Sequence, residues 1–155
     1  MFVADGGHWE NLGLVELLRR RCETIICLDA SGDEIGKFTT LRQAVELASL
    51  ELAGIVERID VQPLSAISPV EGGMPAASVA MLPVEYTGGG QAVIVYAKAQ
   101  MASNLDIALR RYAKEDPIFP NYSTANQFLR NKQFEQLVAL GRSAGRDVVA
   151  ALAPG

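Results

Sequence analysis

Asp5, Gly6 and Gly7 form the segment of the sequence with the clearest chemical potential. They follow a short apolar run at residues 2–4, so the Asp5 carboxylate is expected at the end of a strand. Catalytic groups of open α/β sheets gather at the carboxyl ends of strands, and two glycines leave room for a partner to approach. The alternative is structural, because an aspartate before glycine also forms Asx turns and caps the next segment.

The residues after the glycines could support this carboxylate or only shape the chain. His8 stands three residues after Asp5, which suggests either the base of a Ser-His-Asp triad or an orienting and packing role. Trp9 is interpreted as a core or groove-lining aromatic side chain. Glu10 and Asn11 are expected to set the start of a helix, and Asn11 could also hydrogen-bond the turn that holds Asp5.

Acidic side chains follow the next apolar run as well. Asp29 comes directly after residues 24–28 and could point to the same edge as Asp5, although a role in a turn fits it better. Asp33 and Glu34 add negative charge, but the ligand spacing of an EF-hand is missing, so no calcium site is predicted. With a single histidine and no CxxC pair, no zinc site is predicted either. We expect neither a metal nor another cofactor.

Length and composition narrow the function classes. The chain has 155 residues, of which 49% are hydrophobic and 21% charged, and this predicts one soluble domain over residues 1–155. A net charge of -4 argues against a nucleic-acid partner, which calls for a basic face. Cys22 and Cys27 do not suggest a disulfide framework, and neither a signal peptide nor an apolar run of membrane length is found, so a cytoplasmic protein is expected.

Apolar periodicity and turn residues predict an α/β fold with a mixed sheet flanked by helices. Strands are expected near residues 24–28, 55–61, 77–86 and 91–98, the last two joined as a hairpin by a Thr-Gly-Gly-Gly turn. Helices are expected near residues 11–21, 40–54, 103–116 and 134–148. Asn11 and Thr40 are the expected caps of the first two helices, and Gly141 or Gly145 could break the last one. Residues 62–75, rich in proline and glycine, are expected to form a loop.

The sequence resembles one family over most of its length. Residues 5–21, DGGHWENLGLVELLRRR, are similar to the segment that begins at the catalytic aspartate of patatin-like phospholipases, especially the larger bacterial members. Residues 24–31, TIICLDAS, and residues 116–129, DPIFPNYSTANQFL, also fit that family. Asp-Gly-Gly alone is a weak motif, whereas the combined spacing is fairly specific.

This resemblance implies a patatin-like three-layer fold and a serine lipid acyl hydrolase that cleaves phospholipid or acylglycerol esters with a Ser-Asp dyad. In such enzymes the serine lies in a Gly-x-Ser-x-Gly elbow, and a glycine-rich loop donates N–H groups to the oxyanion. Asp5 matches the catalytic aspartate, and Gly6 and Gly7 match the glycines after it. His8 and Asn11 are expected to support the motif.

The resemblance covers only the C-terminal portion of such a domain, because the family places the elbow and the oxyanion loop before the aspartate. No serine of this chain is expected in an elbow, and Ser31 and Ser143 come nearest in local sequence. The chain alone is therefore expected to be inactive, whereas the full-length protein would act on a lipid or acyl-ester substrate.

Other interpretations and partners remain open at this point. One alternative is a non-catalytic remnant that binds lipid or protein, and another is an unrelated α/β domain. If an N-terminal half is missing, the remaining sheet has an unpaired apolar edge. We therefore expect the chain to need that half or to self-associate. The run Arg19–Arg21 could touch anionic headgroups, and the full-length protein could be membrane-associated.

Overall fold

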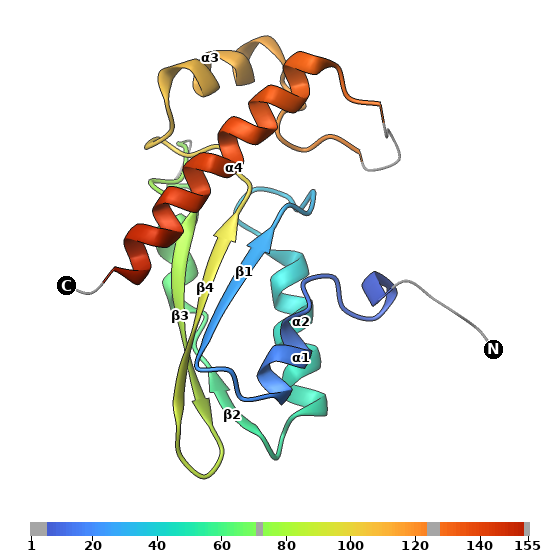
Figure 1. The fold of residues 1–155 in the computed structure, drawn as a ribbon, viewed down its shortest axis with the longest axis vertical. Helices are drawn as coiled ribbons and strands as arrows, with labels where there is room; N and C mark the ends of the chain where they lie inside the picture. Colours follow the sequence, from blue (N-terminus) through green and yellow to red (C-terminus); the bar gives the residue numbers. More distant parts are fainter. Residues whose placement is uncertain (1–5, 71–72, 124–127, 154–155) are drawn as a thin grey trace.

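A four-stranded sheet with helices on both faces forms the centre of the protein (Figure 1). The computed structural model describes residues 6–70, 73–123 and 128–153. The elements in chain order are η1 (Gly6–His8), α1 (Leu14–Arg19), β1 (Thr24–Asp29), α2 (Thr39–Glu51), β2 (Val56–Ile59), η2 (Gln62–Ile67), β3 (Val79–Tyr86), β4 (Gln91–Lys98), α3 (Ile107–Glu115) and α4 (Asn131–Leu152). The strand order is β1-β4-β3-β2. Because β1 runs parallel to β4 and the other neighbours are antiparallel, the predicted α/β fold with a mixed sheet is confirmed.

The predicted hairpin of β3 and β4 forms the longest ladder of the sheet, from Val79 opposite Ala97 to Glu85 opposite Gln91. Its turn passes through three glycines, residues 88–90, whose φ angles are 79°, 90° and 109°. Residues with a Cβ atom rarely adopt these positive φ angles, which explains the run of glycines.

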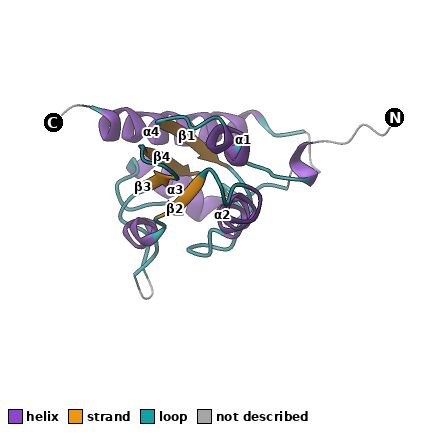
Figure 2. Cartoon of the chain, turned by 90° about the horizontal axis from the view of Figure 1, so that it is seen from below, coloured by secondary structure: helices purple, strands orange, loops and turns teal. Residues whose placement is uncertain are grey.

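The sheet lies between two helical layers, as Figure 2 shows for α2 and α4. On one face, Leu14 of α1 and Leu41 of α2 belong to the same buried core as Ile25, Leu82 and Ile94 of the sheet. On the other face, Val148 of α4 packs with Val95 and Ala97 of β4. Burial of such side chains contributes about 1.5–3 kcal/mol each, so apolar packing on both faces holds the sheet.

A smaller core lies beyond the end of the sheet toward which β1 and β4 point (Figure 1). Leu109 and Tyr112 of α3 pack there with Phe119 and with Leu140 of α4. Helix α4 therefore has two roles, since its first half completes this small core and its second half covers the sheet. The helical layer made by α3 and α4 closes the end of the sheet where parallel strands usually present functional groups.

Several local expectations are wrong. Residues 62–75 do not form only a loop, because they begin with η2, whose Leu64 and Ile67 are buried. Helix α4 runs unbroken through Gly141 and Gly145, because packing along its length outweighs the helix penalty of two glycines. The helix expected from residue 103 begins only at Ile107.

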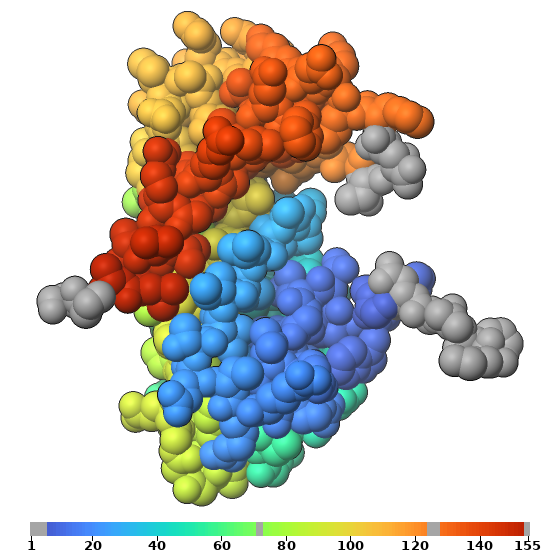
Figure 3. Space-filling view, in the orientation of Figure 1, coloured from blue at the N-terminus to red at the C-terminus, as the bar shows by residue number. Residues whose placement is uncertain are grey.

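Strand β1 lies at the edge of the sheet, and none of the described residues pairs with its outer side. Its side chains alternate: Ile25 and Cys27 are buried, whereas Ile26 is 50% exposed and Leu28 is 68% exposed. The strand was predicted correctly, and only one of its two faces is buried. Helix α4 packs on β3 and β4 and leaves this face of β1 uncovered, as Figure 3 shows in the blue region beside the red helix.

An unpaired apolar edge invites another strand, so we expect the isolated chain to associate through β1. Leu28→Lys should weaken this association by about tenfold or more, because burial of a leucine is worth roughly 1.5–3 kcal/mol. Sedimentation velocity over a concentration series measures the effect. Leu50→Lys, at a 74% exposed position of α2, is the matched control. Identical sedimentation of both variants and the unsubstituted chain would contradict the expectation.

Candidate functional site

The described part of the Asp-Gly-Gly segment is a tight turn. Asp5 lies outside the described residues, so its predicted role is neither supported nor opposed by a contact. From Gly6 to His8 the chain forms one turn of 3-10 helix, in which the N–H groups of Trp9 and Glu10 donate to the Gly6 carbonyl at 2.9 and 3.0 Å. This turn directs the chain from the glycines into α1.

Glu10, rather than Asn11, caps the start of α1. The Glu10 carboxylate accepts hydrogen bonds from the N–H groups of Leu12 and Val15, the latter at 3.3 Å. The residue before the helix is Gly13, with φ of 68° and no side-chain cap. The expectation that Asn11 caps this helix is therefore wrong, and the expectation that Glu10 helps to set its start is confirmed. A carboxylate is also the favoured partner for the positive end of a helix dipole.

Three of the predicted support residues lie around one pocket of about 180 Å³. Gly7, His8 and Asn11 line it on one side, and Thr40 and Gln43 of α2 line it on the other. His8 is exposed and makes no ion pair within the described part of the chain. Hence no described carboxylate orients His8 as a general base. We call the pocket lined by Gly7, His8, Asn11, Thr40 and Gln43 the motif pocket.

A buried cluster of charged groups, which sequence reasoning did not predict, lies at the ends of β1 and β4. The Lys98 ammonium lies 3.1 Å from Asp29 Oδ1 and 3.1 Å from Asp33 Oδ2. It also donates to the Ser31 carbonyl at 2.9 Å and to Ser31 Oγ at 2.8 Å. The Tyr96 hydroxyl donates to Asp29 Oδ2 at 2.6 Å. Asp29 is 1% and Lys98 4% exposed, so these charges depend on one another for solvation.

Strand register explains why these groups meet. In the parallel ladder Asp29 stands opposite Lys98 and Cys27 opposite Tyr96, and alternate residues of a strand share one face. Asp29 Oδ1 also accepts the Ser31 N–H at 2.8 Å, which confirms the predicted role of Asp29 in a turn. The sequence signal that could have revealed the cluster was a lysine and a tyrosine in the apolar strand at residues 91–98, beside a strand that ends in aspartate.

Asp33 connects the buried cluster to α2. Its carboxylate accepts hydrogen bonds from the Thr40 N–H at 3.2 Å and from Thr40 Oγ1 at 2.8 Å. Thr40 was predicted to cap this helix itself; instead the residue before the helix is Phe38, with φ of 50°, and Asp33 reaches across the loop. Because Thr40 also lines the motif pocket, the cluster fixes one wall of that pocket.

The protonation state of the cluster follows from its contacts. Burial raises the pKa of Asp33, but hydrogen bonds from Thr40 and Lys98 outweigh burial and leave this pKa below its ordinary value of 3.8. Burial, together with the hydrogen bond to Asp29, raises the pKa of Tyr96, which therefore remains a donor. Burial likewise raises the pKa of Cys27 to about 12, so this thiol is inert at neutral pH.

Ser31 and Lys98 resemble a Ser-Lys pair in distance but not in chemistry. A lysine that activates serine must be neutral and must accept the hydroxyl proton. Lys98 has three protons and four acceptor atoms around it, and two of those acceptors are carboxylates. It is therefore held as a charged donor, and its donation to Ser31 Oγ reduces the nucleophilicity of that oxygen.

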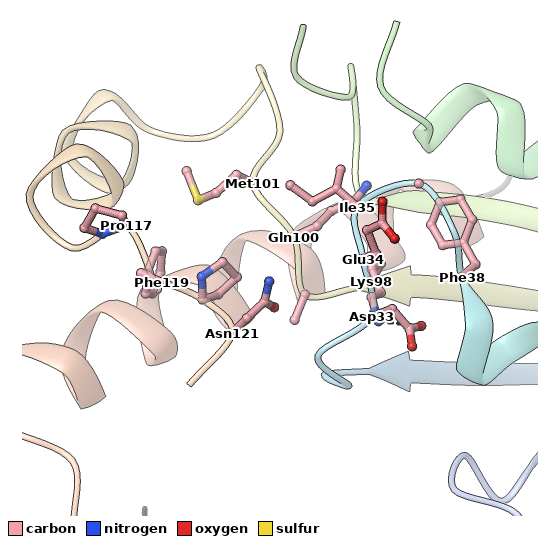
Figure 4. A pocket seen from close by; sticks show the side chains of 13 residues that line it. Asp33, Glu34, Ile35, Phe38, Lys98, Gln100, Met101, Pro117, Phe119 and Asn121 are labelled. Carbon is pink, nitrogen blue, oxygen red and sulfur yellow. Dashed lines mark hydrogen bonds and ion pairs between the residues drawn. The ribbon is translucent and has the colours of Figure 1, made fainter. Parts of the chain in front are cut away.

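A second pocket, of about 100 Å³, lies between the buried cluster and the α3–α4 layer (Figure 4). Lys98 and Gln100 line it from the sheet side, and Phe119 and Asn121 line it from the segment after α3. Gln100 is buried and donates to two backbone carbonyls, so its amide nitrogen is already satisfied. The pocket is smaller than the roughly 300–1,000 Å³ of a usual ligand site.

Residues 141–145 read GRSAG and match the Gly-x-Ser-x-Gly pattern letter for letter, a match that sequence reasoning missed. The structure nevertheless agrees that Ser143 is not in an elbow, because it lies inside α4 and is buried. An elbow is a strained turn from strand to helix whose glycines allow close packing. Here a Cβ on Gly141 or Gly145 would meet no atom within 4 Å, so neither glycine has that role.

Two wider searches are negative within the described part of the chain. No group of three or more histidine, cysteine, aspartate or glutamate side chains is arranged to hold a metal ion among residues 6–70, 73–123 and 128–153. Over the same residues, no helix has both the length and the apolar character that a membrane crossing requires.

Lys98→Met should destabilise the fold by about 3–5 kcal/mol, because it leaves two buried carboxylates without their cation. Urea unfolding followed by circular dichroism measures the free energy. Lys132→Met, which breaks an exposed ion pair with Glu115, is the matched control and should cost less than about 1 kcal/mol. Equal losses in the two variants would show that Lys98 is not needed to neutralise the two buried carboxylates.

The lowered pKa of Asp33 predicts the direction of acid sensitivity. Its contribution to stability is fully present above its ordinary pKa of 3.8 and is lost as the pH falls through the lower pKa of the folded state. Unfolding free energies measured from neutral pH down to about pH 2 should therefore fall less steeply for Asp33→Asn. Asp106→Asn, at an exposed carboxyl, should retain the original slope. Parallel curves for Asp33→Asn and the unsubstituted chain would contradict this assignment.

Comparisons with known proteins returned no match. No family model matches the chain, and no curated protein or solved structure does either. The function must therefore be inferred from the sequence motif, the strand edge and the contacts described above.

Proposed function

We propose that this chain is the C-terminal portion of a patatin-like lipid acyl hydrolase and that it supplies the aspartate of a Ser-Asp dyad. The observation that carries this proposal is the position of the Asp-Gly-Gly segment. From Gly6 onward the chain turns against the start of α2, beside the end of the sheet to which β1 points. Asp5 directly precedes this turn in sequence. Carboxylates at such sheet ends commonly take part in catalysis.

The open side of β1 supports a site that is completed by another segment. Ile26 and Leu28 are half or more exposed on a strand whose outer side has no described partner. A further strand parallel to β1 would pair with the free backbone groups of this edge and would end at the same end of the sheet as the motif pocket. A serine elbow after such a strand would then lie at the same end of the sheet as the Gly6–His8 turn, which directly follows Asp5 in sequence.

The described serines support an external nucleophile. Ser31 Oγ accepts a hydrogen bond from the charged Lys98, and Ser143 lies within α4. Neither has a neighbouring base or a strand-to-helix turn, which are the two features that activate a serine in hydrolases. The proposed reaction is attack of an external serine on the ester carbonyl: Asp5 takes the serine proton and passes it to the departing alcohol, and water, activated in the same way, then cleaves the acyl-serine to release the fatty acid and restore the serine.

An ester-hydrolysis assay on the chain joined to its upstream coding sequence tests this proposal. A short-chain nitrophenyl ester reports turnover, and a fluorophosphonate probe reports an activated serine. The joined protein should be active and labelled, whereas this chain alone should be neither. Asp5→Asn should reduce kcat by about 10³-fold or more, as expected when the partner of the nucleophile is lost.

Two variants serve as matched controls for the assay. Ser143→Ala removes the serine of the GRSAG match and should retain activity, because that serine is buried in α4. His8→Ala should retain most activity, because a Ser-Asp dyad needs no histidine. A joined protein that is folded but inactive would favour a lipid- or protein-binding remnant instead. Activity lost in Ser143→Ala but kept in Asp5→Asn would refute the proposed dyad.

A further inference from the structure

One face of α3 gathers cations and an exposed aliphatic side chain. Ile107, Arg110, Arg111 and Lys114 follow the spacing i, i+3, i+4 and i+7, which places them on the same side of a helix. The opposite side carries Leu109 and Tyr112, which are buried in the small core. Helix α3 is therefore anchored through one face and presents the other, which we call the α3 basic face.

The cations of this face have no described counter-charge in contact. Arg110, Arg111 and Lys114 make no ion pair within the described residues. Moreover, the Nε–H group of Arg110 is buried and lacks a hydrogen-bond partner there. Arg111 and Lys114 are exposed, so an external anion can reach their charges.

The run Arg19–Arg21, the other basic segment of the sequence, behaves differently. Arg19 pairs with Glu51 at 3.1 Å, and Arg20 pairs with Glu16 at 3.0 Å. Arg21 donates to the Thr87 and Gly89 carbonyls of the hairpin turn at 3.1 and 2.8 Å. The guanidinium groups of these arginines already have partners within the protein. The contact with anionic headgroups expected from the sequence is therefore not favoured for residues 19–21.

Apolar side chains lie beside the free cations. Ile107 is 78% exposed, and Met74, from the loop before β3, is 44% exposed. Both line an open depression of about 660 Å³ together with the three cations. Large exposed aliphatic side chains among unpaired arginine and lysine are typical of surfaces that meet a lipid interface, where the apolar groups enter the acyl boundary and the cations meet phosphates.

We propose that the α3 basic face docks the protein on an anionic phospholipid membrane. Charge complementarity selects this partner: three unpaired cations attract a negatively charged surface, and Ile107 and Met74 can insert beside them. Nucleic acid fits less well, because it would gain nothing from the aliphatic groups. The overall charge of -4 opposes docking only weakly, since charges farther than a Debye length of about 10 Å are screened.

The acidic groups nearest this face do not cancel it. Glu115, at the end of α3, is paired with Lys132 at 2.9 Å. Asp106 precedes the helix and is the one unpaired carboxylate among residues 106–115. Two positive charges therefore remain in excess over the helix. Helix α3 lies at the end of the molecule to which β1 and β4 point (Figure 1).

This inference does not require catalysis, so its test uses vesicles of ether-linked lipids, which no acyl hydrolase can cleave. Co-sedimentation compares phosphatidylcholine vesicles with and without phosphatidylglycerol. The chain should bind only the anionic vesicles, and added salt should weaken binding. Arg111→Gln/Lys114→Gln should lower the partition coefficient by about 25-fold, at roughly fivefold per cation near the surface. Ile107→Ser should lower it several-fold without changing the salt dependence.

The matched control is Arg142→Gln/Arg146→Gln, which removes two exposed cations from α4 and should bind as the unsubstituted chain does. Circular dichroism and thermal melts verify that all variants are folded. Equal binding to neutral and anionic vesicles, or equal loss in both double variants, would overturn the proposal. So would binding of a polyglutamate peptide through α3 with no binding to vesicles, because the face would then recognise an acidic protein. None of these outcomes depends on ester hydrolysis.

Discussion

The buried ion pairs of Lys98 with Asp29 and Asp33 are the interaction on which the rest of the site depends. They join the ends of two parallel strands to the loop before α2. Asp33 in turn holds the first turn of α2 through Thr40, and Thr40 lines the motif pocket together with Gly7 and His8. One lysine thus sets the position of a helix start, and the helix start shapes the motif pocket.

Charges at this place serve the specificity of the fold more than its stability. Well-packed apolar groups of equal volume often stabilise an interior as well as a buried ion pair does. The ion pairs of Lys98, however, can form in only one register of β1 against β4. A slip of one residue between β1 and β4 would turn Lys98 to the opposite face of the sheet, away from both carboxylates. The cluster therefore secures the parallel pairing that a twisted sheet of short strands leaves weakly determined.

Much of the fold could be predicted from the sequence, because apolar periodicity and glycine turns are local signals. The strands at residues 77–86 and 91–98 are an example, since the turn between them requires glycine angles. Helix starts were predicted poorly, because the caps of α1 and α2 come from Glu10 and Asp33, which lie outside the expected cap positions. The Lys98 cluster was not predicted either: a lysine and a tyrosine in an apolar strand hint at a buried partner, but which aspartates they meet depends on which strands are neighbours. GRSAG shows the converse: a motif can match in letters and still lie inside a helix.

The proposed hydrolase and the proposed membrane surface make geometric demands that can be compared. An enzyme that acts on membrane lipids must present its reacting groups on the side that meets the bilayer. In this chain the motif pocket adjoins the start of α2, next to the end of β1, and α3 lies beyond that same end of the sheet. Strand β1, which exposes Ile26 and Leu28, points toward that end as well. A strand parallel to β1 would therefore end at the same end of the sheet as the motif pocket and α3, so the two proposals place the nucleophile and the membrane-binding helix at one end of the molecule.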